Sequence, residues 1–564
     1  MLVNALPKSE TDRWDQLQVR NSSPTTSTHH LNRIADFSND RHKELYQVAA
    51  QVIRPWLEQC DAGHPCRCGG LQHKEHRKSI AASVSAKKTE PPLLPTRVID
   101  VGLGDNHQPR LHVSQPGERA TYLTLSYRWG EGNASAMTTA HNLTSRTARI
   151  DLADLPNTIR DAVDVTRAIG IPYIWIDAVC IVQATADNPG DFRSEGIKMA
   201  AYYGNSYCTI AAAAADNTSQ GFLQPRTDGI FADDSCALLP WISQRGRLAR
   251  VGPGLPHWRG DVREASMYKR AWVLQERALS ARILHWGRKA LWWECEHQRA
   301  SEFYPEDPIS ASMDQNQPYM EPGRWLAAMS SPADIWPDWA RLTREYSSMD
   351  LGRESDRLIA LQGLVDVVSQ RFPQEIYLSG MWKSSLAQAL CWAVHERRKV
   401  EGPDPVVPCV APSWSWAACP HPVYYLYPPT HARAEVLGYE PKKLEENPGQ
   451  CALHVRGSLE KAPLKGMEII RQNDDGTSYN TKDYAFNIRF DSCPARCPDM
   501  SVVDLLLMAV RDWGQRGKHA TQFLLVTQVE GSESHYRRVG HVMCWKKTLD
   551  WKSKKAEDVD IYLV

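Results

Sequence analysis

Apolar residues recur along the chain with two different spacings, and these spacings predict an alternation of strands and helices. Residues 121–127 form a β-rich run, and residues 173–179 and 207–213 are almost continuously apolar. Continuous apolarity is typical of strands that are covered on both faces, as in a parallel sheet. Apolar residues at three- and four-residue steps predict a helix over 156–170, and a second helix is expected over 191–203. The order β-α-β-α-β predicts an α/β domain with an open, doubly wound parallel sheet.

The pattern differs on either side of this region. The first 40 residues are rich in Ser, Thr and Asn and are expected to lack fixed structure. A helix with one apolar stripe is predicted over 41–60, followed by a Cys/His cluster and a linker. Beyond the α/β region, a mainly helical part gives way to short strand-like runs between turn residues. The predicted parts are therefore 1–40, 41–118 (helix, Cys/His cluster and linker), 119–295 (α/β domain), 296–412 (helical) and 413–564 (β-rich).

Composition narrows the class of protein. A chain of 564 residues is too long for one hydrophobic core. Lys plus Arg equals Asp plus Glu at 66 each, so the net charge is zero. A neutral chain gives no electrostatic indication of nucleic-acid binding. No apolar run reaches the ~18 residues of a membrane-spanning helix, and the first 30 residues lack the apolar core of a signal peptide. We therefore expect a cytoplasmic protein with protein partners, whose 14 cysteines are reduced thiols.

Two polar-aromatic stretches follow the first two strands of the α/β pattern. Residues 126–130 (Ser-Tyr-Arg-Trp-Gly) end one run, and residues 177–180 (Asp-Ala-Val-Cys) end the next. Because the carboxyl ends of parallel strands line one edge of a sheet, where crevices form, we expect both stretches to meet at one rim. This rim is the main candidate site, and its candidate ligand-binding residues are Tyr127, Arg128, Trp129, Cys180 and Gln183.

Asp177 admits two interpretations. A carboxylate at the end of a buried strand needs hydrogen bonds or a cation. It is either a structural group, in an ion pair with Arg128 or Arg160 or as a cap on the next turn, or a group that faces a ligand. The adjacent Cys180 would need a nearby cation to act as a thiolate, and no His lies between His141 and His257. Its alternative is a buried, inert thiol.

A second polar stripe lies on a helix predicted over 270–279. Trp272, Gln275 and Glu276 share one face of it. They either lock the helix to the sheet through buried hydrogen bonds or contribute to a ligand site.

A group of soft metal ligands lies near the N-terminal helix. Cys60, His64, Cys66 and Cys68 fall within nine residues and could hold a structural zinc ion. The His64-x-Cys66-x-Cys68 spacing is tight for one ion, so reduced thiols and a surface histidine are the alternative.

Three blocks of the sequence resemble the heterokaryon-incompatibility (HET) domain of filamentous fungi in sequence, order and spacing. They are residues 122–130 (Tyr-Leu-Thr-Leu-Ser-Tyr-Arg-Trp-Gly), residues 155–183 from Leu-Pro-Asn-Thr-Ile to Cys-Ile-Val-Gln, and residues 270–280 (Arg-Ala-Trp-Val-Leu-Gln-Glu-Arg-Ala-Leu-Ser). Segments on both sides also resemble the long members of this family. One departure is the Ala-Thr-Ala-Asp that follows Gln183, where the family usually continues into an acidic stretch.

The resemblance implies a role in heterokaryon incompatibility, in which fusion of unlike hyphae triggers programmed death. It also implies a fold distantly similar to the Toll/interleukin-1 receptor (TIR) domain. Some family members accompany biosynthetic gene clusters. In some TIR enzymes a glutamate on the second crossover helix cleaves NAD, and Glu195 falls roughly at that place. Glu195 is either such a group or a solvated helix glutamate. Together with Asp177 at the rim it is a catalytic candidate.

Two function classes follow. The first is a signalling or effector module of non-self recognition that acts through homotypic or incompatibility-partner contacts. The second is an enzyme that cleaves an NAD-type nucleotide at the rim, or that serves a biosynthetic pathway. Exposed apolar surface at the rim would favour the module, whereas a concave pocket with convergent polar groups would favour the enzyme.

Overall fold

The computed structural model divides into two units, residues 1–324 and residues 325–564. Each unit is described by itself below. The structure describes residues 17–21, 37, 39–63, 90–104, 108–130, 132–226, 237–239, 249–253, 256–295, 298–303, 329–395, 411–425, 431–441, 451–465, 468–472, 478–480, 486–491, 502–512, 519–544 and 558–564.

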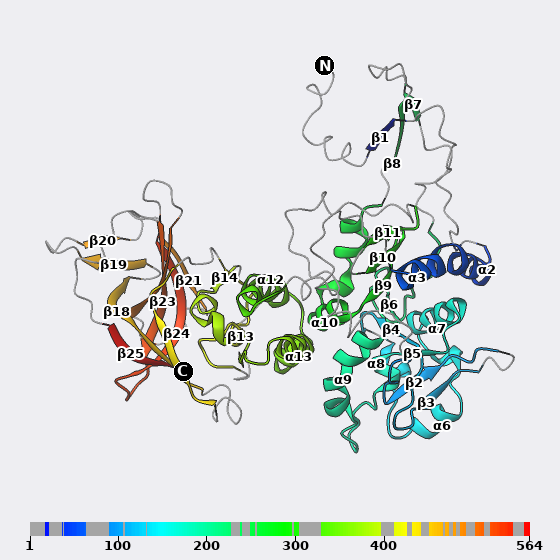
Figure 1. Ribbon diagram of the computed structural model, residues 1–564, viewed down its shortest axis with the longest axis horizontal. Coiled ribbons are helices and arrows are strands. Elements are labelled where there is room, and N and C mark those ends of the chain that lie inside the picture. Colours follow the sequence, from blue (N-terminus) through cyan, green and yellow to red (C-terminus); the bar gives the residue numbers. More distant parts are fainter. Residues whose placement is uncertain are drawn as a thin grey trace. The chain divides into compact units, whose positions relative to one another are not determined.

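Four parallel strands form the centre of an eight-stranded sheet in the first unit (Figure 1). Their spatial order is β5 (Tyr173–Trp175), β4 (Tyr122–Ser126), β6 (Cys208–Ala211) and β9 (Arg282–Trp286). Every residue of β4 and β6 is buried, as expected for strands that are covered on both faces. The structure confirms the predicted α/β class and its parallel strand pairs.

Two crossover helices link these strands. Helix α7 (Asn157–Ile169) connects β4 to β5, and α9 (Phe192–Asn205) connects β5 back across β4 to β6. Because the two crossovers run in opposite directions, connections of the same hand place the helices on opposite faces of the sheet. Accordingly, α7 packs against the π-helical turn at Ala49–Ile53, whereas α9 packs against α10 (Ala271–Leu279).

Local signals fix both ends of α7. Pro156 precedes its first residue, and Gly170 ends it with φ of 91°, in the left-handed region that suits glycine. The buried carboxylate of Asp161 anchors the middle of the helix. It accepts hydrogen bonds from the backbone N–H groups of Phe222 (2.7 Å) and Leu223 (2.9 Å) and pairs with Arg41.

The strand predicted over 173–179 is wrong in its second half. Strand β5 ends at Trp175, and α8 (Asp177–Cys180) is a single helical turn. The carboxylate of Asp177 accepts a 2.7 Å hydrogen bond from the N–H of Ala178. The N–H of Cys180 donates to the carbonyl of Ile176 over 2.7 Å. Both a buried strand and a buried helical turn are apolar throughout, so the pattern did not separate them.

The sheet is mixed rather than wholly parallel. Antiparallel strands flank the parallel core: β2 (Arg97–Asp100) and β3 (Arg110–Val113) on the side of β5, and β10 (Leu291–Cys295) and β11 (Arg299–Ser301) on the side of β9. The sequence predicts a short strand over 98–101 and a hairpin of 282–286 with 290–294, but the predicted parallel sheet did not include them, because local patterns do not encode which strands pair.

Helices precede the sheet, as the apolar stripe over 41–60 predicts. Helices α2 (Arg41–Val48) and α3 (Arg54–Asp61) adjoin the π-helical turn. The first 40 residues lie mostly outside the described residues. One stretch there differs from the expectation of no fixed structure, because β1 (Leu17–Asn21) pairs with β8 (Ala249–Pro253), which also pairs with β7 (Ala237–Leu239). Two further short helices of this unit are α5 (Asn133–Ala136) and α6 (Leu143–Ala148).

Five strands of the second unit pair in a closed ring. They are β18 (Leu453–Lys465), β22 (Val502–Asp512), β23 (His519–Gln528), β24 (His535–Cys544) and β25 (Asp558–Leu563). Strand β18 pairs with both β25 and β22, so the ring closes and leaves none of the five as a free edge. The β-rich C-terminal part is confirmed.

Helices and shorter strands complete this unit. The helices are α12 (Ile335–Ser347), α13 (Gln362–Arg371) and α14 (Leu386–Ala389). The shorter strands are β12 (Tyr377–Leu378), β13 (Met381–Trp382), β14 (Ala393–Val394), β15 (Val423–Tyr424), β16 (His431–Ala432), β17 (Glu435–Tyr439), β19 (Glu468–Gln472), β20 (Ser478–Asn480) and β21 (Phe486–Phe490). In the described part of the chain, none of the helices has the length and apolarity needed to span a membrane.

Candidate functional site

Side chains from the carboxyl ends of β4 and β5 converge on Asp177. The hydroxyl of Tyr127 donates to its Oδ1 over 3.0 Å, and the indole N–H of Trp129 donates to its Oδ2 over 2.8 Å. With the N–H of Ala178, three donors surround one carboxylate. The two predicted polar-aromatic stretches therefore meet at this edge of the sheet.

The cation that faces Asp177 is Arg270, at the start of α10. Burial raises the pKa of Asp177, and the positive charge of Arg270 opposes that shift. Arg270 also donates a 2.7 Å hydrogen bond to the carbonyl of Tyr127. Arg128 and Arg160 were the expected partners if Asp177 formed an ion pair. In the structure the cation is Arg270, and Arg160 bonds to Asn157, one turn away on its own helix. Arg270 was not a predicted site residue, although it is the first residue of the third block that resembles the HET domain.

Glu276, also on α10, is a second buried carboxylate of this cluster. Its Oε2 lies 2.5 Å from the hydroxyl of Ser126, the last residue of β4. Burial raises the pKa of Glu276 to about 7, although the Ser126 hydroxyl and Arg270 favour its charged form. The contact joins α10 to the sheet, which matches the locking interpretation of the polar stripe. Ser126, Tyr127, Trp129, Asp177, Arg270 and Glu276 are called the strand-end cluster below.

The polar stripe has two further residues, Gln275 and Trp272. Gln275 is buried, and Trp272 is partly buried with its ring edge-on to Phe192 of α9, with the ring centroids 6.2 Å apart. The stripe therefore connects α10 with both the sheet and α9.

Cys180 and Gln183 support the turn that follows β5. The thiol of Cys180 is buried, which raises its pKa to about 12, and its sulfur accepts from the N–H of Ile176 at 3.4 Å. The amide of Gln183 donates to the carbonyls of Asp177 (3.3 Å) and Ile181 (3.2 Å). These contacts are those of a structural thiol and a structural amide.

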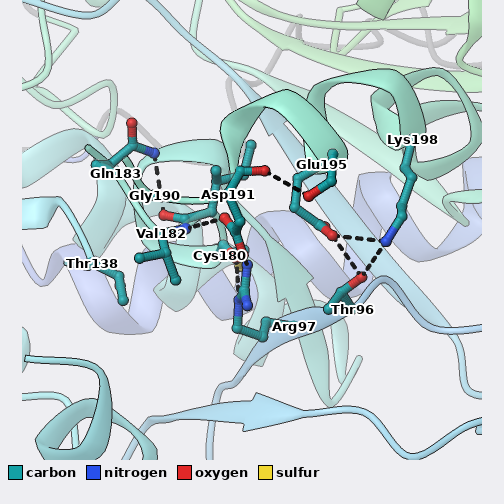
Figure 2. Close-up of polar contacts among 12 residues, drawn as sticks. Thr96, Arg97, Thr138, Cys180, Val182, Gln183, Gly190, Asp191, Glu195 and Lys198 are labelled. Atoms are coloured by element: carbon teal, nitrogen blue, oxygen red, sulfur yellow. Dashed lines mark hydrogen bonds and ion pairs between the residues drawn. The ribbon is translucent and has the colours of Figure 1, made fainter. Parts of the chain in front are cut away.

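Glu195 belongs to a different group of polar contacts, which includes Thr96 and Lys198 (Figure 2). Its carboxylate accepts hydrogen bonds from Thr96 (3.0 Å), Lys198 (2.8 Å) and Tyr202 (2.8 Å). Burial alone would raise the pKa of Glu195, but these three donors outweigh it and the pKa is lowered. None of its contacts in the described structure is with Tyr127, Arg128 or Asp177.

Arg97 and Asp191 fasten the start of α9 to the sheet, and the sequence analysis named neither of them. Asp191 accepts a 2.8 Å hydrogen bond from the N–H of Val182 and pairs with the Arg97 guanidinium (Figure 2). Arg97 also donates to the carbonyl of Cys180 over 2.7 Å. This ion pair joins β2 to both ends of the loop between α8 and α9.

Arg128 makes no hydrogen bond or ion pair through its side chain with any residue that the structure describes. Its charge acts on Asp216, in the loop that follows β6. Its neighbours Tyr127 and Trp129, by contrast, donate hydrogen bonds to Asp177 after β5.

The metal-ligand prediction falls mostly outside the described residues, where His64, Cys66 and Cys68 lie. Cys60 is described, and its sulfur accepts a 3.2 Å hydrogen bond from Nε of Arg282. Within the described ranges, no group of three or more His, Cys, Asp or Glu side chains is arranged to hold a metal ion.

Comparison with protein families identifies the first unit. A family model described as heterokaryon incompatibility protein (HET) matches residues 122–276. The match begins with β4, ends at Glu276 and contains the whole strand-end cluster. Neither the curated proteins nor the solved structures gave a match. The chain therefore carries a HET domain at residues 122–276.

Proposed function

We propose that this chain is a non-self recognition protein of the heterokaryon-incompatibility type, which triggers cell death through contacts between its HET domain and other proteins. The observation that carries the proposal is the pair of large apolar side chains that α9 presents to solvent. Phe192 is 42% exposed and Ile197 is 64% exposed. Exposed apolar groups of this size on a folded domain are typical of protein-binding surfaces when they cluster with aromatic neighbours.

The position of Phe192 strengthens this interpretation. The chain leaves β5 at its carboxyl end, so the first turn of α9 starts at the same edge of the sheet as the strand-end cluster. Trp272 packs against Phe192 there and is itself only partly buried. Exposed aromatic surface at the rim is the feature that favours an interaction module.

The strand-end cluster supports the exposed aromatic surface at the rim structurally, because its carboxylates bind protein groups. Asp177 has three hydrogen-bond donors, and Glu276 is held by Ser126. Glu195 also has three donors. A carboxylate that stabilises an oxocarbenium-like sugar must face its substrate, and these carboxylates face protein groups. This supports the module over the NAD-cleaving enzyme.

The proposal extends to a TIR-like fold, a cytoplasmic location and homotypic or incompatibility-partner contacts. The order of the four parallel strands, with crossovers in both directions, supports such a fold. Contacts with other copies or with a partner fit the apolar side chains that α9 exposes, Phe192 and Ile197.

Induced expression in a filamentous fungus tests the proposal. Wild-type chain should cause hyphal death, scored as dye uptake, and Ile197→Asp should abolish it because a carboxylate would be desolvated in the contact. Leu103→Asp is the matched control, since Leu103 is 45% exposed in the same unit but outside α9. Death caused equally by all three chains, or by none, would contradict the proposal.

A further inference from the structure

We propose that the partner of α9 is a different protein, not a second copy of this chain, and that it presents carboxylate groups around an apolar side chain. The inference rests on the proposed function, because it names the chemistry of the partner that the exposed side chain of Ile197 meets. It is drawn from the charges that surround Ile197 on the outer face of α9.

Helical spacing defines the outer face of α9. The side chains exposed after its first residue are Arg193, Ser194, Ile197, Lys198, Ala201 and Asn205. These positions recur at steps of three and four residues, so they share one side of the helix. The buried residues Glu195, Met199 and Tyr202 lie on the other side. The outer face therefore holds one large apolar side chain, Ile197, together with two cations and no acid.

Arg193 carries an unbalanced positive charge on this face. It is exposed one turn before Ile197, and within the described structure its guanidinium has no hydrogen-bond or ion-pair partner. The carboxylate that precedes it in the sequence, Asp191, pairs instead with Arg97. An unpaired guanidinium beside an apolar group suits a carboxylate, which it binds through paired hydrogen bonds.

Lys198 adds a second cation next to Ile197. Its ammonium group donates to Glu195 (2.8 Å) and to Thr96 (3.1 Å), and its side chain is still 49% exposed (Figure 2). The side chain of Glu195 is only 4% exposed, so the carboxylate that balances this charge lies beneath the surface. A protein that approaches α9 therefore meets positive charge on the outside.

A second copy of the chain is a poor partner for this face. In a two-fold symmetric contact the same surface meets itself, so Arg193 and Lys198 of one copy would lie against those of the other. Like charges brought together in a contact oppose binding, whereas opposite charges favour it. Acidic side chains on a different protein are therefore the complement of the outer face.

An anionic membrane would also attract two cations, but the apolar surface of α9 is too small for it. Helices that lie in a membrane surface bury a broad apolar face among the lipids. The large side chains of Met199, Tyr202 and Tyr203 are buried in the protein. Ile197 is the one large apolar side chain on the outer face of α9. These observations favour a protein partner over a lipid surface.

Photo-cross-linking in hyphae tests the chemistry of the partner. The full chain carries p-benzoylphenylalanine in place of Ala201, which is exposed one turn after Ile197, and mass spectrometry identifies the cross-linked peptide. We expect a peptide of another protein with a net negative charge. Arg193→Glu should lower the cross-linking yield at least about tenfold, whereas Arg193→Lys keeps the charge and should keep most of the yield.

Lys43→Glu is the matched control. Lys43 is an exposed cation on α2, so its reversal changes the net charge of the first unit by the same amount, and the yield should stay at the wild-type level. Melting temperatures should agree between the wild type and Arg193→Glu, because Arg193 makes no described side-chain bond. Vesicles of phosphatidylserine and phosphatidylcholine should not retain the purified chain.

Four results would overturn the proposal. The first is a cross-link to another copy of this chain. The second is no cross-linked protein, or a cross-linked peptide that is neutral or basic. The third is an equal yield in the wild type and Arg193→Glu. The fourth is retention of the chain by the anionic vesicles.

Hyphal death separates this outcome from that of the proposed function. If Ile197→Asp abolishes death but Arg193→Glu kills as the wild type does, contact through α9 stands and the acidic partner is wrong. If Ile197→Asp itself kills as the wild type does, the proposed function is wrong.

Discussion

The Tyr127 hydroxyl lies 3.0 Å from the Asp177 carboxylate, although the two residues are 50 positions apart in the chain. This contact ties the end of β4 to the turn that follows β5. Trp129 adds a second donor from the same loop. The rim of the sheet is therefore held by hydrogen bonds from one strand end to the next.

Tyr127→Phe removes that contact and should destabilise the first unit. The buried carboxylate loses one of three donors, which costs about 1–3 kcal/mol, and the urea unfolding midpoint should fall accordingly. Tyr46→Phe is the control, because Tyr46 is 41% exposed on α2, and it should change the unfolding free energy by less than about 0.5 kcal/mol. A Tyr127→Phe chain as stable as the control would show that the contact does not support the rim.

Stability of the first unit should fall as the pH rises from about 4.5 to about 7. The folded chain raises the pKa of Glu276 to about 7, above its ordinary value of 4.5. Folding therefore favours the protonated carboxyl, and that contribution is fully present below the ordinary pKa and lost as the pH rises through the folded pKa. The loss from this group is at most about 3 kcal/mol. Burial raises the pKa of Asp177 as well, so its contribution has the same sign.

Glu276→Gln should flatten this pH dependence, because the amide stays neutral at every pH. Urea unfolding at pH 5, 6, 7 and 8 measures it. Glu58→Gln, on the exposed face of α3, should leave the slope as it is in the wild type. An unchanged slope in Glu276→Gln would mean that another group carries the pH dependence.

Glu294 is the centre of a buried charge network, and its loss should be severe. It accepts from Arg277 (2.9 and 3.1 Å), Arg299 (2.9 Å) and His285 (3.0 Å). Despite burial, these partners hold the pKa of Glu294 well below its usual range, while burial lowers that of His285 to about 4. Glu294→Gln leaves two arginines without their counter-charge and should cost about 3–5 kcal/mol.

The exposed pair between Arg259 and Glu264 provides the comparison for Glu294. Glu264→Gln breaks an ion pair at 3.1 Å whose side chains are both well exposed, and it should cost no more than about 1 kcal/mol. Thermal unfolding of the two variants side by side measures the difference. Similar melting temperatures would contradict the assigned role of Glu294.

Local patterns predicted the elements of the HET domain better than their pairing. The apolar steps of α7, with Pro156 and Gly170 at its ends, are local signals, and the structure has that helix where it was predicted. The turn at Asp177–Cys180 was predicted as strand because buried turns and buried strands share continuous apolarity. The ring closed by β18 and β22 joins strands far apart in the sequence, and no local spacing encodes such a pairing.

The strand-end cluster was predicted in part for the same reason. The carboxyl ends of parallel strands share one edge of a sheet, and this rule predicted that residues 126–130 and 177–180 lie close together. It gave no information on Arg270 or Arg97, whose partners are set by the packing of α10 and of β2. Glu195 was placed by likeness to TIR enzymes, and its contact with Thr96, just before β2, depends on how α9 packs beside that strand, which no local spacing encodes.

We propose that the HET domain acts through the apolar side chains that α9 exposes, and not through catalysis by Glu195. Hyphal death after induced expression of Glu195→Gln and Ile197→Asp tests it most directly, once matched melting temperatures and expression levels show that both chains are folded. Glu195→Gln keeps an oxygen that can accept from Thr96 and Lys198, so it should kill as the wild type does. Ile197→Asp should not kill. Loss of death in Glu195→Gln together with full death in Ile197→Asp would contradict the account.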